Sequence, residues 1–214
     1  MDFLELAKTR YTTKHFDPNK SINADDLSKL LEVLRLSPSA VNAQAWKFIV
    51  GSGDAKQRIM SAVADFNVSR IEDCSHFILI CAQNKLDEKY YKEVSDKEDF
   101  DGRYPNHPEI KSIVDEHRIE YGKYQESLGE YAQWTSKQAY IAMTSLVYAA
   151  KSLGIDSTIM EGFDFKKMDE ILNLSSQNLH SVVLVALGYS LKNDSNKVRP
   201  KSRLAKERVI TFIN

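Results

Sequence analysis

The sequence predicts a mixed fold of helices and strands, either α/β or α+β. Stretches of helical period alternate along the 214-residue chain with short apolar runs typical of buried strands. The clearest helical pattern is a row of leucines at the spacing of a core-facing helix: Leu27, Leu30, Leu31 and Leu34. The clearest strand is the uninterrupted apolar run "HFILICA". Since no repeat or linker interrupts this order, we expect one domain over residues 1–214.

Apolar spacing and end signals define the elements of the first half of the chain. Residues 2–9 are predicted to form a short helix. A longer helix begins after Ser21 or Asn23, either of which can cap it, and stops before Pro38. "WKFIVG" is predicted as a strand that ends at "GSGD", and Asp54 begins a further helix. "HFILICA" follows as the next strand.

The second half is predicted to place two long helices after a polar insertion. Residues 85–108 are polar and aromatic, and so long an insertion is expected to act as a lid. A charged helix follows over 109–127, and an alanine-rich helix over 130–153 ends at Gly154. Because the second helix is apolar on most sides, it belongs in the centre of the fold or in a subunit interface. The chain finishes with the short helix "DFKKMDEILN", the buried strand "HSVVLVALGY" and the extended tail "VITFIN".

Composition and missing motifs exclude several classes of function. The 29 basic and 30 acidic residues give a net charge of −1, so the molecule is not built to coat nucleic acid or an anionic membrane. No stretch approaches the ~20 apolar residues of a membrane span, and "MDFLELAKTR" is too acidic for a signal peptide. Cys74 and Cys81 are expected as buried free thiols, without histidines at metal-ligand spacing. We therefore expect a cytoplasmic protein without a metal site.

Motifs of the common nucleotide and hydrolase sites are also absent. The chain has no GxGxxG after a strand, no P-loop lysine, no GxSxG elbow and no HExxH. Four other patterns remain: "RYTTKHF" at 10–16, "SPSAVNAQAWKF" at 37–48, "MEGFD" at 160–164 and "RPKSRL" at 199–204. Each alone has an ordinary explanation, as a solvated loop, a helix stop, a capped turn or an exposed basic tail.

Together, in this order and spacing, the four patterns resemble the FMN-dependent, oxygen-insensitive NAD(P)H nitroreductases, a family that includes dihydropteridine and flavin reductases. The resemblance extends over nearly the whole chain and includes "DFDGRY" at 99–104 and the "W…KQAY" of the long helix. It implies a three-layer α-β-α fold of the α+β class, with a mainly antiparallel central sheet flanked by helices. It also implies a homodimer with flavin sites between the subunits, in which the C-terminal strand "VITFIN" is swapped onto the partner's sheet.

The resemblance assigns residues to each part of FMN, which has a dianionic phosphate, a polar ribityl chain and a flat ring. Cations suit the phosphate, and a cation near the N1–C2=O edge stabilises the charge of the reduced ring. The implied phosphate ligands are Arg10, Lys201 and Arg203. The implied contacts to the ribityl chain and ring are Tyr11, Thr12, Lys14, Asn67, Arg70, Ile159, Met160, Glu161 and Gly162. The partner chain is implied to supply Pro38, Ser39, Ala40, Asn42 and Gln138. His15 and Phe16 are expected to pack at the edge of the site.

Several of these positions depart from the family pattern. Ala40 replaces a serine and Ala45 a proline, while Ile159 stands where close relatives have proline. Arg70 replaces a lysine, which keeps the charge but changes its geometry. The alanine at position 40 is therefore expected to remove one polar contact, and Ile159 is expected to reduce the rigidity of the chain near the ring.

The implied activity is a two-electron ping-pong reaction. NADH or NADPH reduces the flavin and leaves, and a nitroaromatic or quinone then takes its place. No side chain is assigned as catalytic, since the hydride moves at flavin N5. A lid is expected from Tyr104, Tyr121 and Tyr124. Two alternatives stay open: the natural oxidant is a dihydropteridine or a free flavin, or the protein binds FMN without catalysis.

Overall fold

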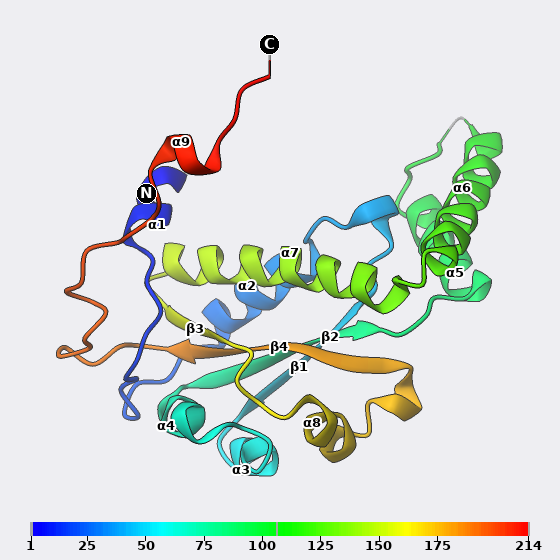
Figure 1. Ribbon diagram of the computed structural model, residues 1–214. Coiled ribbons are helices and arrows are strands. Elements are labelled where there is room, and N and C mark those ends of the chain that lie inside the picture. Colours follow the sequence, from blue (N-terminus) through cyan, green and yellow to red (C-terminus); the bar gives the residue numbers. More distant parts are fainter. Residues whose placement is uncertain (1, 106, 214) are drawn as a thin grey trace.

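The computed structural model describes residues 2–105 and 107–213, which are built around a four-stranded sheet (Figure 1). Every neighbouring pair of strands is antiparallel. In sheet order the strands are β1 (Trp46–Ser52), β2 (His76–Gln83), β4 (Leu179–Gly188) and β3 (Asp156–Met160). The antiparallel sheet expected from the family resemblance is therefore confirmed.

Helices cover both faces of this sheet (Figure 1). One face carries α2 (Ala24–Arg35) and the long helix α7 (Tyr131–Ser152). The opposite face carries α3 (Ala55–Met60), α4 (Asp65–Asp73) and α8 (Phe165–Leu172). This is the three-layer α-β-α arrangement of the α+β class that was expected.

The remaining helices lie beyond the two ends of the sheet. At one end α5 (Glu88–Phe100) packs against α6 (Pro108–Ser127). Toward the other end lie α1 (Phe3–Thr9), which contacts α7, and α9 (Lys206–Val209) (Figure 1). Two single turns of 3₁₀-helix complete the elements: η1 (Ala40–Asn42) and η2 (Ser175–Gln177). Within the described ranges, no helix combines the length and the apolar character needed to cross a membrane.

The continuous apolar run of β2 is explained by burial on both faces. Successive strand side chains point to opposite faces, so Ile78 and Ile80 pack toward α2 and α7, while Phe77 and Leu79 pack toward α3, α4 and α8. β2 is also central in the sheet, between β1 and β4. A strand buried in this way has no polar face, which is why its sequence does not alternate.

The two cysteines behave as predicted. Cys74 and Cys81 are both buried and free. Burial raises the pKa of Cys74 to about 11 and that of Cys81 to about 12. Neither thiol therefore ionises near neutral pH, and both serve as small apolar side chains.

Four elements differ from the sequence-based expectation. The single helix expected after Asp54 is two helices, α3 and α4. β3 was not predicted, because "DSTIM" is short and partly polar, and its strand character comes from pairing with β4. The polar insertion at 85–108 contains α5, whose N-terminus is capped by the Asp87 side chain accepting from the Tyr90 N–H at 2.8 Å. The tail is not extended throughout, since α9 includes Val209.

A matched pair of valines tests the sandwiched sheet. Val185 in β4 is fully buried, whereas Val50 in β1 is 37% exposed. Val185→Ala should lower the free energy of unfolding by about 2 kcal/mol, from lost burial and the cavity left behind. Val50→Ala should cost less than about 1 kcal/mol. Equal losses in urea denaturation would show that the two strands are packed alike.

Candidate functional site

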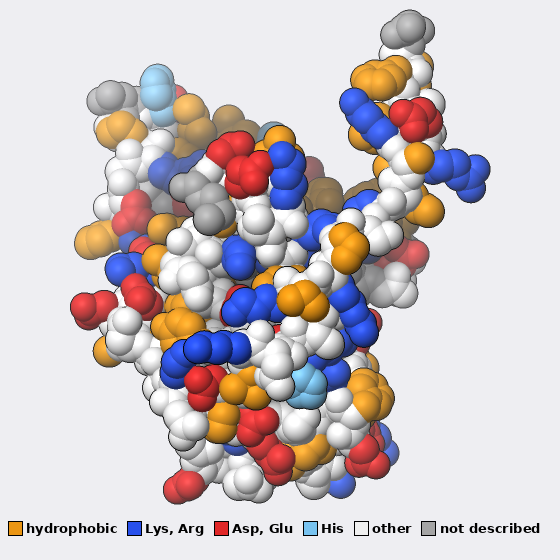
Figure 2. Space-filling model, turned by 90° about the vertical axis from the view of Figure 1, so that its left-hand side faces the viewer, with side chains coloured by type: hydrophobic (Ala, Val, Ile, Leu, Met, Phe, Trp, Pro, Cys, Tyr) orange, Lys and Arg blue, Asp and Glu red, His pale blue; other side chains and the backbone are white. Residues whose placement is uncertain are grey.

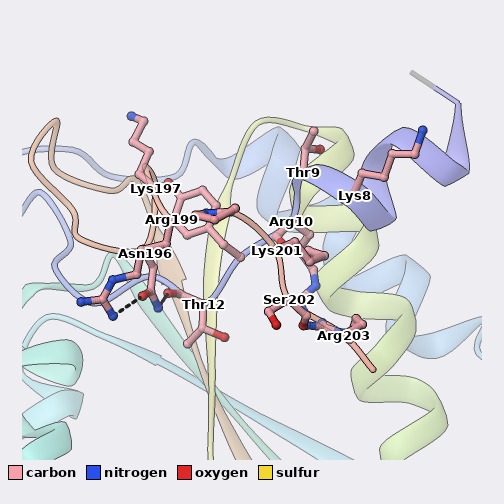
Figure 3. Close-up of a pocket in the computed structure, with 12 residues that line it drawn as sticks. Lys8, Thr9, Arg10, Thr12, Asn196, Lys197, Arg199, Lys201, Ser202 and Arg203 are labelled. Carbon is pink, nitrogen blue, oxygen red and sulfur yellow. Dashed lines mark hydrogen bonds between the residues drawn. The ribbon is translucent and has the colours of Figure 1, made fainter. Parts of the chain in front are cut away.

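A basic pocket forms where the loop after α1 meets the segment before α9 (Figure 3). Its volume is about 470 Å³. Its lining includes the basic side chains Lys8, Arg10, Lys197, Arg199, Lys201 and Arg203. No acidic side chain of the described residues lines it. Figure 2 shows Lys and Arg side chains gathered on this side of the molecule, below the projecting C-terminal arm.

The pocket is held together by the buried carboxylate of Asp194. The backbone N–H groups of Lys14 and His15 donate to Asp194 Oδ2 at 2.6 and 2.8 Å. The Asn196 N–H donates to Asp194 Oδ1 at 2.9 Å, and the Asn196 side-chain amide donates to the Thr12 carbonyl at 2.8 Å. These bonds fasten "RYTTKHF" to the C-terminal segment, so two distant parts of the sequence share one site.

The other side of the loop lies against β3. Thr12 forms a parallel β-bridge with Ser157, and the Thr13 N–H donates to the Ser157 carbonyl at 3.1 Å. The Tyr11 hydroxyl hydrogen-bonds the Ser190 hydroxyl at 2.8 Å. The loop is therefore fixed on two sides, with Arg10 at its start facing the pocket.

Lys201 places an ammonium group inside the pocket. Its Nζ donates to the carbonyls of Ala7 and Arg10 at 2.5 and 2.6 Å. Burial lowers the pKa of Lys201 below its ordinary value, and the positive charges of Arg10 and Arg203 lower it further. Figure 3 shows Arg10, Lys201, Ser202 and Arg203 close together, whereas Lys8 and Lys197 extend away from them. Cations gathered in this way favour an anion between them.

A second cluster lies just beyond the end of β3. The Asn67 side-chain amide donates to the Gly162 carbonyl at 3.0 Å, and the Arg70 guanidinium donates to the Asn67 side-chain oxygen. A Cβ on residue 162 would lie 2.6 Å from Asn67 Nδ2, so any larger residue would have to displace the Asn67 amide. The neighbouring Glu161 carboxylate accepts a hydrogen bond from Tyr140. Burial, and then this carboxylate, raise the pKa of Tyr140 to about 12.

β3 sets the distance between the basic pocket and the second cluster. Ser157 lies beside the pocket loop, and Glu161 follows the last residue of the strand. At ~3.3 Å per residue, these positions are about 13 Å apart. Between them, the Met160 side chain is buried in the core and Ile159 packs against the α7 side of the sheet.

A third group of expected site residues lies in the turn before β1. The Ala40 N–H donates to Gln138 Oε1 at 2.8 Å, and the Gln44 N–H donates to the Ser39 hydroxyl at 3.0 Å. Val41 has φ of +49°, a left-handed conformation in which a β-branched residue is strained by about 1–3 kcal/mol. The turn therefore needs support from its surroundings.

This turn and the basic pocket are separated within one chain. Gln138 lies on α7, and Lys151 further along the same helix has its Nζ 5.4 Å above the Tyr11 ring. At ~1.5 Å per residue, Gln138 and Lys151 are about 20 Å apart. The Ser39–Asn42 turn thus lies apart from the basic pocket, whereas Tyr140, two residues after Gln138 on α7, bonds Glu161 of the second cluster.

The α5–α6 hairpin carries a buried ion pair next to that turn. Arg118 Nη2 donates to Glu98 Oε2 at 2.7 Å, and both residues are nearly inaccessible, with 3% and 4% of their surface exposed. The Tyr104 hydroxyl also donates to Glu98 Oε2, at 2.6 Å, and the Asn42 amide donates to Glu98 Oε1 at 2.7 Å. Burial alone would raise the pKa of Glu98, but these hydrogen bonds outweigh it and hold the pKa below its ordinary value.

The aromatic residues expected to form a lid are placed in the same region. Tyr104 is tied to Glu98, and the Tyr121 ring packs edge-on against Trp134 with centroids 5.5 Å apart. Tyr124 is largely exposed on α6. Whether they close over a substrate stays a prediction.

Some residues of the site were not anticipated from the sequence, and one was misplaced. Asp194, Glu98 and Arg118 were missed, since charged residues in a polar turn or a charged helix give no sign that they are buried. The turn sequence "NDSN" was the one local signal for Asp194. Phe16 packs in the core as expected, but the His15 side chain is exposed rather than packed, because only its backbone is held.

Comparisons with known proteins agree with this geometry. A profile described as the Nitroreductase family matches residues 7–189. The chain is 35% identical to the "Oxygen-insensitive NAD(P)H nitroreductase" of Salmonella typhimurium strain LT2, over 100% of both chains. It is 37% identical to the "Major NAD(P)H-flavin oxidoreductase" of Aliivibrio fischeri, over 96% of each. A crystal structure from Exiguobacterium sibiricum 255-15, solved in complex with FMN, superposes with a TM-score of 0.79 at 20% identity, covering 100% of this chain and 98% of the other. The chain belongs to the nitroreductase family.

The Asp194 carboxylate can be tested by a nearly isosteric change. Asp194→Asn replaces one acceptor oxygen by an NH₂ group that cannot accept from the backbone N–H groups facing it. The variant should lose about 1–3 kcal/mol of stability in chemical denaturation. Asp101→Asn, which alters an exposed pair with Lys97, is the control and should change little. A wild-type value for Asp194→Asn would refute its role in joining the two segments.

Proposed function

We propose that this protein is an FMN-dependent oxidoreductase that uses NADH or NADPH to reduce nitroaromatics or quinones in two-electron steps. Membership of the nitroreductase family supports an NAD(P)H-dependent oxidoreductase, since relatives bear the names NAD(P)H nitroreductase and NAD(P)H-flavin oxidoreductase. The observation that carries the cofactor assignment is the basic pocket at one end of β3 and the polar cluster at the other. This arrangement suits a ligand with an anion at one end and a flat polar ring at the other.

The phosphate end fits the chemistry of the pocket. Arg10 and Arg203 offer planar donors that match phosphate oxygens, and Lys201 adds a point charge. The lowered pKa of Lys201 supports the same reading, because it reflects burial and positive charges that a dianion would balance. Arg10, Lys201 and Arg203 are therefore proposed to hold the FMN phosphate, with Thr12 beside the ribityl chain.

The ring end is proposed to rest on the second cluster. Asn67 and Arg70 would hold the pyrimidine edge of the ring, and the backbone N–H groups of Glu161 and Gly162 would donate hydrogen bonds to it. Lys14, on the loop that Asp194 fixes, stabilises negative charge at the N1–C2=O edge by preorganised electrostatics. Bound FMN supplies the hydride-accepting chemistry itself, so the protein needs only to orient the reactants and tune the charge.

The separation of the Ser39–Asn42 turn from the basic pocket supports a site shared between subunits. Ser39, Ala40, Asn42 and Gln138 lie about 20 Å along α7 from the basic pocket, so they do not belong to the phosphate end of the proposed flavin site. We therefore propose that these residues and Pro38 act on the partner's flavin in a homodimer.

The C-terminal arm supports the same assembly. Its apolar side chains are exposed: Val209, Ile210, Phe212 and Ile213. One edge of the sheet, β3, is covered by the Thr12 loop, whereas β1 has no partner on its outer side among the described residues. An extended arm from a second copy is proposed to pair with such an open edge.

A second candidate for the natural oxidant is a free flavin, which the 37% identity to a flavin oxidoreductase favours. Comparison of kcat/KM for a nitroaromatic, a quinone, a dihydropteridine and a flavin separates these oxidants. The other alternative, FMN binding without catalysis, is not supported, since the relatives are named as reductases. Anaerobic addition of NADPH should accordingly bleach the yellow colour of bound FMN.

Flavin retention tests the cofactor assignment. The purified protein should be yellow and carry stoichiometric FMN. Arg203→Ala and Lys14→Ala should each weaken FMN binding about tenfold or more in fluorescence titrations, because each removes a charged contact. Lys29→Ala, which removes an exposed cation paired with Asp26 on α2, is the control. A colourless protein that takes up no FMN would overturn the proposal, and wild-type affinity in both variants would overturn these residue roles.

The dimer is tested with two exposed phenylalanines. Phe212 in the arm is 79% exposed and Phe100 at the end of α5 is 84% exposed in the single chain. Phe212→Glu should shift the protein toward monomer and reduce FMN retention, since a charge cannot be buried against a partner. Phe100→Glu should leave both unchanged. Light scattering and flavin absorbance report the two properties, and a monomeric wild type would contradict the shared site.

A further inference from the structure

The Arg118–Glu98 ion pair of the α5–α6 hairpin has no part in the proposed flavin contacts. Both groups are buried, and each makes more than one hydrogen bond. A buried pair of this kind is costly to desolvate and can often be replaced by apolar side chains without loss of stability. Stability alone therefore does not account for the pair, and the groups that it contacts indicate its role.

Both members of the pair bond the strained turn before β1. Arg118 Nε donates to the Val41 carbonyl at 2.7 Å, and Glu98 Oε1 accepts from the Asn42 side-chain amide at 2.7 Å. Val41 and Asn42 have φ of +49° and +50°, so two successive residues are left-handed. The pair therefore bonds the turn at two of its three left-handed residues, the third being Gln44.

The hairpin side of the pair is itself anchored. Arg118 Nη1 donates to the Ser95 hydroxyl, and the Tyr104 hydroxyl donates to Glu98. Ser95 and Glu98 lie on α5 and Arg118 on α6, so the pair connects both helices to the turn. A cavity of about 520 Å³ lies beside it and is lined by Val41, Asn42, Glu98, Tyr104, His117 and Arg118, among others.

We propose that Arg118 and Glu98 are positioning residues, which hold the Ser39–Asn42 turn in the conformation that the flavin site requires. The inference rests on the proposed function, because the turn is assigned there to the partner's FMN. Neither side chain touches the flavin. Arg118 acts through the Val41 carbonyl and Glu98 acts through the Asn42 amide, so the α5–α6 hairpin controls a site that it does not line.

The main test removes both charges at once. Glu98→Met combined with Arg118→Met leaves no unpaired buried charge and no polar group to bond the turn, so the double variant should fold with a melting temperature near that of the wild type. Its FMN dissociation constant should nevertheless rise about tenfold, the size expected for lost hydrogen bonds to charged groups. Lys123→Met is the matched control, since it breaks the exposed Lys123–Glu88 pair between the same two helices.

A second measurement does not depend on flavin. Hydrogen exchange of the peptide covering residues 39–44 should be about tenfold faster in the FMN-free double variant than in FMN-free wild type, and unchanged in Lys123→Met. If wild type binds no FMN, the proposed function fails, while this exchange rate still decides whether the pair holds the turn. Unchanged exchange would overturn the inference, whatever the flavin result.

Glycine at position 41 provides a rescue. Val41→Gly removes the strain of a β-branched residue at φ of +49°. Added to the double variant, it should recover part of the lost FMN affinity, because the turn then needs less support. A merely structural role of the pair predicts no rescue. Normal FMN affinity in the double variant, or no recovery on adding Val41→Gly, would overturn the positioning role.

Discussion

The buried carboxylate of Asp194 is the interaction on which the candidate site depends. Cations from both ends of the chain repel one another, so they gather only where the backbone is fixed. Asp194 fixes it by accepting from the N–H groups of Lys14, His15 and Asn196. Burial, and then the positive charges of Arg10 and Arg203, lower the pKa of Lys201. An anion that binds between these cations would relieve this repulsion, which is why we propose a phosphate there.

The Ser39–Asn42 turn is also held by a buried carboxylate, that of Glu98. Glu98 accepts from Asn42, Tyr104 and Arg118, just as Asp194 accepts from three backbone groups. In both cases a nearly inaccessible acid secures a loop that regular secondary structure does not hold. β3 and α7 then set the distances between the parts. The sheet and α7 thus set the distances between the groups of site residues, and the buried carboxylates of Asp194 and Glu98 fix the loops that carry those residues.

Much of the architecture follows from local patterns in the sequence. The leucine row of α2 and the apolar run of β2 could be predicted because burial leaves a periodic signature. β3 could not, since its strand character depends on pairing with β4. The basic residues at both ends of the chain could be grouped by family resemblance. The buried acids that hold the loops of the site, Asp194 and Glu98, could not be predicted, because their burial arises from tertiary packing and not from a pattern of residue spacing.

The central claim is that the basic pocket binds the phosphate of FMN. The most direct measurement compares the affinities of the flavin-free protein for FMN and for riboflavin, which shares the ring and ribityl chain but lacks the phosphate. The account predicts at least about a hundredfold tighter binding of FMN, with the difference shrinking as salt is added. Equal affinities at low salt would contradict it, because the cations around Arg10, Lys201 and Arg203 would then serve no anion of the cofactor.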